Sequence, residues 1–196
     1  MRIFIRESVR MKQNQSIKNS NIIFYVLLSV LSRLIPHPAN MTAMTNLSLY
    51  AGARLGRRTA LVMTVASLFL SNWYFSIIYH YAFFSITSFF MFSGFIGITL
   101  FGRHAIKDTT LKNIFPTVLV ASFGYWLWTN LGVWLQGSYP MSLSGLMTCF
   151  VMALPFLKNA LIGDVAWMLV VFGLLDKMLA PHIYSVVDKP SSLVAK

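Results

Sequence analysis

Runs of hydrophobic residues separated by short polar breaks extend over most of the chain and predict a series of helices. A bilayer core of about 30 Å needs about 20 apolar residues in one helix, and hydrocarbon admits only helices and closed barrels as spanning structures. We therefore predict an all-α protein, a polytopic transmembrane helix bundle with about six spans. The six runs cover residues 22–35, 40–55, 59–75, 81–101, 114–135 and 156–179.

The stretch of residues 143–178 is too long for one straight span and allows two topologies. Pro155 interrupts it, because proline cannot donate a backbone hydrogen bond inside a helix. In the first topology, residues 143–154 form a short helix near the outer surface and residues 156–179 form the sixth span. In the second topology both halves cross the membrane, which gives seven spans and an external tail.

Basic residues predict the orientation, because Lys and Arg concentrate in cytoplasmic loops. They gather in the N-terminal tail, at the end of the second run and after the fourth run. Outside the tail these residues are Arg54, Arg57, Arg58, Arg103, Lys107 and Lys112. We therefore predict a cytoplasmic N-terminus in a bacterial cytoplasmic (inner) membrane. The same rule favours six spans over seven, because six spans keep Lys177, Lys189 and Lys196 inside.

Three parts follow from this pattern. We predict a basic cytoplasmic tail at residues 1–21, a transmembrane helical domain at residues 22–180 and a cytoplasmic tail at residues 181–196. A cleavable signal peptide is the alternative for the first part. Arg33, Pro36 and His37 stand where a small-residue cleavage site would be needed, which argues against it.

The composition agrees with lipid as the solvent, since 57% of the residues are hydrophobic, 11% are charged and the mean hydropathy is +0.66. In a soluble protein a net charge of +11 would suggest nucleic acid, but these basic residues serve as topology signals, so we expect no nucleic-acid partner. Cys149, the single cysteine, excludes an intrachain disulfide and a cysteine-based metal site. Phosphate-loop and zinc-protease motifs are absent, so we expect neither an enzyme nor a cofactor.

Polar residues inside the apolar runs are the candidates for function, because they are costly in lipid and tend to line cavities. Most of them fall toward the outer half of a six-span bundle and predict a ligand cavity there: Arg33, His37, Asn40, Asn46, Lys158, Asn159 and Asp164. The alternative is structural, with the basic residues reaching lipid headgroups and the asparagines tying helices together.

Trp126, Asn130 and Trp134 are spaced four residues apart and so share one helix face. Two indole rings beside an amide can hold a planar ligand, with stacking area from the rings and directional hydrogen bonds from the amide. The alternative makes Trp134 an interfacial anchor and Trp126 a packing residue.

The charges of this cavity allow two interpretations. Arg33 and Lys158 together predict an electropositive site for a carboxylate or phosphate ligand. Asp164 can instead neutralise one of these cations, because a buried acid must be paired or protonated. His37, between two prolines, is either a pH-sensitive gate or a solvated loop residue.

Small residues close the second run, and such residues allow close helix approach. They predict either docking of a partner subunit or packing within the bundle, and they are Ala51, Gly52, Ala53 and Gly56.

These motifs resemble two membrane families. An uncharacterised family of bacterial integral-membrane transport proteins shares the pattern Arg33-x-x-Pro36-His37-Pro38-x-Asn40, Ala51-Gly52-Ala53, Asn130-Leu131-Gly132-Val133-Trp134, Tyr139-Pro140, Gly145-Leu146, Pro155-Phe156 and Gly163-Asp164. In the order of its features the chain is also similar to the substrate-binding S components of energy-coupling factor (ECF) vitamin transporters. There a Pro-Phe-Asn-x-x-Lys stretch begins the sixth helix, and this chain has similar residue types at 155–159 in a different order.

The S-component resemblance implies an S-component-like fold of six helices and capture of a vitamin-like or micronutrient small-molecule substrate from outside. It also implies a transmembrane coupling subunit with ATPases as a partner, docked through the small residues named above. Two rivals remain, an ion-coupled secondary transporter with Asp164 or His37 as the coupling residue, and a non-transport membrane scaffold or assembly protein.

Overall fold

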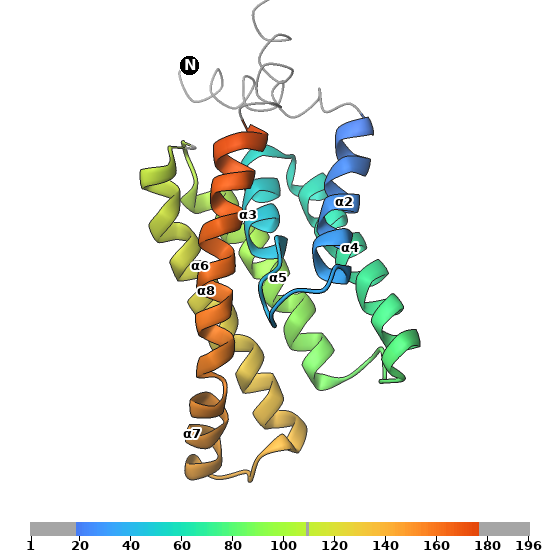
Figure 1. The fold of residues 1–196 in the computed structure, drawn as a ribbon, viewed down its shortest axis with the longest axis vertical. Helices are drawn as coiled ribbons and strands as arrows, with labels where there is room; N and C mark the ends of the chain where they lie inside the picture. The colour runs from blue at the N-terminus through green and yellow to red at the C-terminus, as the bar shows by residue number, and fades with distance from the viewer. Residues whose placement is uncertain (1–18, 109, 177–196) are drawn as a thin grey trace, which may run out of the picture.

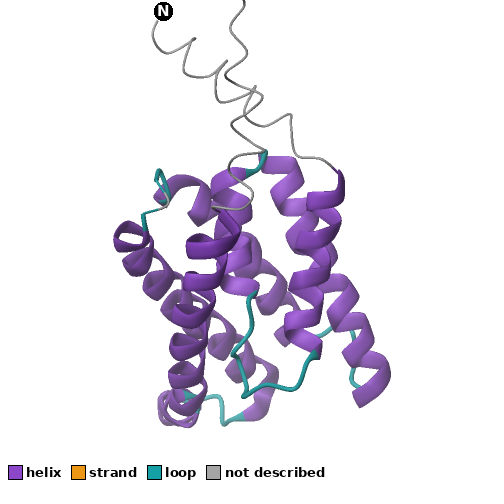
Figure 2. Cartoon of the chain, turned by 45° about the horizontal axis from the view of Figure 1, so that its top comes forward, coloured by secondary structure: helices purple, strands orange, loops and turns teal. Residues whose placement is uncertain are grey.

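The computed structural model describes residues 19–108 and 110–176, and within these ranges every regular element is helical (Figures 1 and 2). Most of the tail at residues 1–21 and all of the tail at residues 181–196 lie outside the described residues. In chain order the elements are α2 (Asn19–Leu34), α3 (Met44–Arg54), α4 (Arg57–Tyr79), α5 (Ile86–Ala105), α6 (Leu111–Val133), the π-helical segment η1 (Trp134–Ser138), α7 (Leu143–Met152), α8 (Leu154–Met168) and the π-helical segment η2 (Leu169–Leu175).

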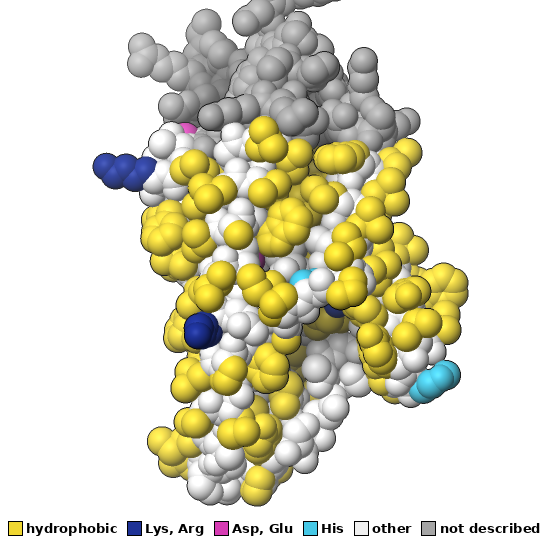
Figure 3. Space-filling view, viewed as in Figure 1, with side chains coloured by type: hydrophobic (Ala, Val, Ile, Leu, Met, Phe, Trp, Pro, Cys, Tyr) yellow, Lys and Arg dark blue, Asp and Glu magenta, His cyan; other side chains and the backbone are white. Residues whose placement is uncertain are grey.

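Four helices are long and apolar enough to cross a membrane: Arg57–Tyr79, Ile86–Ala105, Leu111–Ser138 and Leu154–Leu175. In an 18-residue window of each helix, between 28% and 33% of the residues are buried inside the bundle, and many large apolar side chains are exposed (Figure 3). A soluble protein would not leave so much apolar surface in water. Their length, composition and exposed apolar surface are consistent with a membrane-embedded protein.

The first two predicted spans are shorter than a full crossing by helix length. Helix α2 has 16 residues and α3 has 11. The link between them, residues 35–43, turns well before the far ends of α6 and α7 (Figure 1). Four of the six predicted spans thus meet the length and hydropathy of a crossing helix, while α2 and α3 form a shorter hairpin.

Pro155 separates two helices that run in the same direction. Helix α7 has 10 residues and lies below α8, which continues upward through η2 (Figure 1). Pro155 stands in the first turn of α8, where its missing N–H breaks no helical hydrogen bond. Because the chain does not reverse between α7 and α8, residues 143–154 add no crossing of their own, as in the first predicted topology.

Helix α3 is the centre of the bundle, and its residues Met44–Gly52 are all buried. It packs most closely on α5 at two glycines, because a Cβ at Gly52 would overlap the Thr99 carbonyl and a Cβ at Gly102 would overlap the Leu49 carbonyl. Of the predicted docking residues, Gly52 and its neighbour Ala51 are therefore buried within the bundle, the second interpretation of that pattern. Ala53 is half-buried against the same core and Gly56 precedes α4.

The ends of the described chain lie at the same end of the bundle as the α3–α4 and α5–α6 turns (Figure 1). There Arg54 donates to both carboxylate oxygens of Asp176, Nε to Oδ1 at 2.9 Å and Nη2 to Oδ2 at 2.7 Å. This bidentate ion pair fastens the end of α3 to the end of η2.

Candidate functional site

A cavity of about 320 Å³ opens among α2, the 35–43 link and helices α3, α4, α5, α6 and α8. Its walls follow helical periodicity, with Thr87, Met91 and Phe95 at every fourth position of α5. Ser122, Trp126 and Thr129 line it from one face of α6. The sequence-predicted residues that it brings together are Arg33, His37, Asn40, Trp126 and Asp164.

Arg33 lies in the last turn of α2 and has no carboxylate partner among the described residues. Its Nη2 donates to the sulfur of Met91 at 3.5 Å, and its guanidinium carbon lies 5.8 Å from the centre of the Phe75 ring. Its Nη1 is buried without a hydrogen-bond partner in the described part of the chain. A buried cationic donor left unpaired is costly, and an anionic acceptor in the cavity would remove that cost.

The charge of Arg33 also reaches the α4–α5 turn. Burial raises the pKa of the Tyr81 hydroxyl, and the positive charge of Arg33 acts in the opposite direction. That hydroxyl donates to Oδ1 of Asn72 at 2.9 Å, which ties the turn to the end of α4. Among the described residues, Arg33 is the one Lys or Arg side chain that lines the cavity.

Asp164 on α8 is 2% exposed and forms the other charged part of the lining. The Ser122 hydroxyl donates to its Oδ2 at 2.5 Å, and Asn46 Nδ2 donates to its carbonyl at 2.9 Å and to its Oδ1 at 3.4 Å. Asn46 is fully buried on α3 and does not line the cavity. It therefore positions Asp164 from behind, and three helices hold the carboxylate.

Trp126 presents its ring to the cavity, because its N–H is already used. Nε1 donates to the carbonyl of Ala153 at 3.0 Å, at the junction of α7 and α8. The ring also packs against Phe123 and Phe150, with centroids 5.7 and 5.2 Å away. A ligand can therefore contact Trp126 through its ring and not by hydrogen bonding.

The 35–43 link contributes His37 and Asn40. Nδ1 of His37 lies 2.7 Å from the carbonyl oxygen of Pro38, which can only accept, so Nδ1 carries a hydrogen and Nε2 remains for other contacts. Asn40 adopts a left-handed backbone with φ of 68°, which Asn tolerates better than most residues. Both side chains thus reach the cavity from the turn of the link.

Asn130 lies in a second, neighbouring cavity, which shares Asn40 and Thr129 with the first. Its Nδ2 donates to the Trp126 carbonyl of its own helix at 2.8 Å, and its own carbonyl oxygen lies 3.4 Å from Cys149 Sγ. The amide is therefore occupied in part by its own helix. The predicted stripe would require Trp126 and Asn130 to line the same cavity, but they line different ones.

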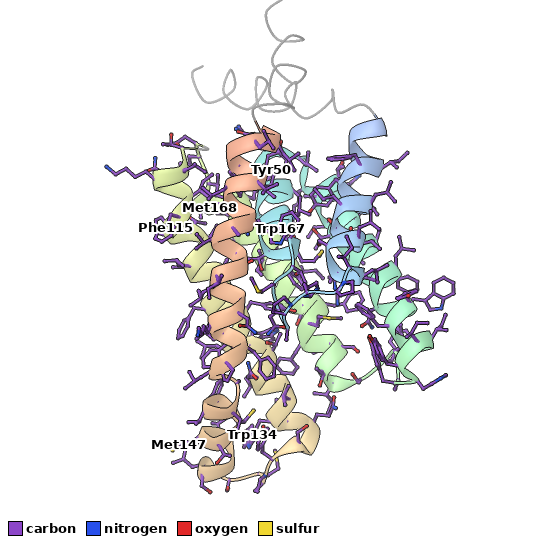
Figure 4. The ribbon with its side chains drawn as sticks, viewed as in Figure 1. Tyr50, Phe115, Trp134, Met147, Trp167 and Met168 are labelled. Carbon is purple, nitrogen blue, oxygen red and sulfur yellow. The ribbon has the colours of Figure 1, made fainter. Side chains whose placement is uncertain are left out.

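Three other predicted residues line neither cavity. Trp134 donates from Nε1 to the Pro140 carbonyl at 3.0 Å and lies at the lower end of the bundle near α7 (Figure 4). Lys158 is exposed on α8 and Asn159 is half-buried. Lys158 thus does not join Arg33 in the lining as predicted for an electropositive site, and Asp164 is the second charged residue there.

Sequence reasoning missed Ser122, Tyr125 and Met91. Ser122 stands four residues before Trp126 and so continues the Trp126 face toward Asp164, a signal that was available in the spacing. Tyr125 and Met91 carried no such signal, because aromatic and thioether residues are also ordinary packing residues in an apolar helix.

Comparison with known proteins finds one family. The family described as a family of unknown function (DUF6580) matches residues 13–185, which is most of the chain. No curated protein and no solved structure matches this chain.

Proposed function

Because the chain belongs to DUF6580, a family of unknown function, we propose its function from the cavity: it is a membrane transport protein that binds a small ligand carrying an anionic group. The guanidinium of Arg33 is the anchor of that group. His37, Asn40 and Trp126 complete the walls, and no catalytic role is proposed.

One observation carries this proposal, the buried Nη1 of Arg33 that has no hydrogen-bond partner among the described residues. A purely structural arginine in a membrane protein pairs with an acid or reaches the headgroups. Arg33 instead lines a cavity beside Met91 and Phe75. A carboxylate or phosphate oxygen would supply the missing acceptor in bidentate form.

We place the cavity on the outer side of a bacterial cytoplasmic membrane. Six of the basic residues in the described part of the chain flank the α3–α4 and α5–α6 turns, which lie at the other end of the bundle (Figure 1): Arg54, Arg57, Arg58, Arg103, Lys107 and Lys112. Lys and Arg mark the cytoplasmic side, so uptake from outside is the direction of transport. From the S-component-like order of motifs in the sequence we further propose a vitamin-like or micronutrient ligand and a coupling subunit with ATPases as partner.

Thermal unfolding of the detergent-purified protein tests the proposal against a panel of vitamins, vitamin precursors, nucleobases and amino acids. A ligand that binds only the folded state raises the unfolding temperature. We expect stabilisation by a compound with an anionic group and about 30-fold or greater loss of affinity in Arg33→Met, which corresponds to about 2 kcal/mol.

Lys158→Met is the matched control, because Lys158 is also a basic residue in an apolar helix but is exposed and outside both cavities. It should retain full affinity. Equal binding by Arg33→Met and the unchanged protein would refute the site, and equal losses in both variants would refute the choice of anchor.

Asp164 favours a second candidate, an ion-coupled secondary transporter, because a buried acid without a cationic partner in the described residues is suited to bind a coupling ion. Uptake into cells separates the two. Loss of uptake on collapse of a proton or sodium gradient, with ATP maintained, selects ion coupling, whereas dependence on ATP and a coupling module selects the ECF type. Absence of any ligand would favour a scaffold.

A further inference from the structure

The candidate cavity carries one cationic and one anionic side chain that do not pair with each other. Arg33 enters from α2 and Asp164 from α8. The only ion pair among the described residues joins Arg54 to Asp176, so no nitrogen of Arg33 lies within 4.0 Å of a carboxylate oxygen of Asp164. No other Lys, Arg, Asp or Glu lines the cavity, so its charges balance.

The two charged groups occupy different parts of the lining. Arg33 contacts Met91 and lies over Phe75, whereas Asp164 contacts Ser122 and Asn46. Tyr125 lies in the same lining as both of them. A molecule that fills the cavity can therefore meet both groups at once.

Each of the two charged side chains lacks a partner of opposite charge, which a ligand could provide. Nη1 of Arg33 has no acceptor, and Asp164 has neutral donors but no cation. A ligand with only an anionic group would pair with Arg33 but would leave the Asp164 carboxylate without a cation in the same low-dielectric space. A purely cationic ligand would do the reverse.

We propose, on the basis of the function proposed above, that the ligand is a small zwitterion of the amino-acid type. Its carboxylate contacts Arg33 and its ammonium group contacts Asp164. Its remaining part lies against the apolar walls formed by Phe95, Tyr125 and Trp126. Complementary charges at both ends exclude simple acids and simple amines, because each would leave one buried protein charge unpaired.

Thermal unfolding of the full-length protein with size-matched probes tests this inference. Leucine, methionine, phenylalanine and tryptophan are each compared with the deaminated acid and the decarboxylated amine of the same side chain. For phenylalanine these are 3-phenylpropionate and 2-phenylethylamine. We expect at least one amino acid to stabilise the protein and both of its partial analogues to bind about 30-fold or more weakly.

Asp164→Asn, which is nearly isosteric, should bind the amino acid and its deaminated acid with similar affinity, whereas Arg33→Met should lose both. The analogue series on the unchanged protein keeps the test valid if either variant fails to fold. Equal binding of the amino acid and the deaminated acid by the unchanged protein would overturn the zwitterion and leave the anion site standing.

Stabilisation by an anionic compound outside the amino-acid panel, with none inside it, would likewise overturn only the zwitterion. Failure of every anionic compound would overturn the proposed function as well. These outcomes differ in which probes bind, so the two proposals can fail separately.

Discussion

The hydroxyl of Ser122 donates a hydrogen bond to Oδ2 of Asp164 at 2.5 Å, joining α6 to α8 at the wall of the cavity. Ser122 is 2% exposed, and water has little access to the group left behind if the hydroxyl is removed. The contact therefore serves both the packing of two long helices and the position of the only acid in the lining.

We expect Ser122→Ala to lower the free energy of unfolding by about 1–3 kcal/mol, because a buried carboxylate oxygen loses its donor. Chemical unfolding in detergent measures the change. Thr117→Ala is the control on the same helix, since Thr117 is half-buried and its hydroxyl donates only to the Asn113 carbonyl of its own helix. Combined with Asp164→Leu, which leaves no side-chain acceptor for the hydroxyl, the Ser122 effect should nearly vanish, and full additivity would contradict a direct contact.

The α3–α5 contact predicts opposite effects at two glycines of α5. Gly102→Ala should destabilise the protein by about 1–3 kcal/mol, because its Cβ would overlap the backbone of Leu49. Gly97→Ala has nothing within 4 Å of the new carbon and should be neutral or stabilising by up to about 1 kcal/mol. Unfolding temperatures of the two variants decide this, and equal effects would mean that the helices do not approach as described.

The Arg54–Asp176 ion pair predicts a loss of stability in Asp176→Asn of about 1.5–3 kcal/mol, because a charge-assisted bidentate contact is removed. Exchanging the two residues in Arg54→Asp/Asp176→Arg should restore part of it. Arg58→Met, at an exposed position nearby, serves as the control and should change little. The pairing would be contradicted if the exchanged protein were no more stable than the single variant.

The proposed orientation predicts which positions an impermeant thiol reagent reaches in intact cells. Cys149→Ala removes the single cysteine and provides the background. Ser138→Cys, at the end of η1, should be labelled from outside, whereas Lys107→Cys, in the α5–α6 turn, should be labelled only after the membrane is permeabilised. The reverse pattern would place the cavity on the cytoplasmic side.

The four long helices could be predicted from the sequence because their apolar runs are long and contain few charged residues. Helix α3 could not be predicted in its true length. Its small and polar residues Asn46, Ser48 and Gly52 resemble a weak span, yet they are buried because other helices of the bundle surround α3. Hydropathy measures the affinity of a segment for lipid, and so it does not report a helix that other helices enclose.

The residues that line the cavity could be predicted only in part, because a polar residue in an apolar run does not by itself show which face of the helix it occupies. The cost of polar side chains in lipid selected Arg33, Asn40 and Asp164, which line the cavity, but it also selected Lys158, which does not. Lys158 and Asp164 are six residues apart, which on an ideal helix is about 240° of rotation, so they lie on different faces. Trp134 shares a face with Trp126 but lies about 12 Å further along the helix axis, beyond the cavity.

The 35–43 link lies between two short helices and outside the four long ones, while it supplies His37 and Asn40 to the cavity. On the function proposed above, the link contributes one part of the cavity wall, and the long helices α6 and α8 contribute Trp126 and Asp164. Relatives that differ in this short stretch should therefore accept different compounds without any change in the helices long enough to cross the bilayer.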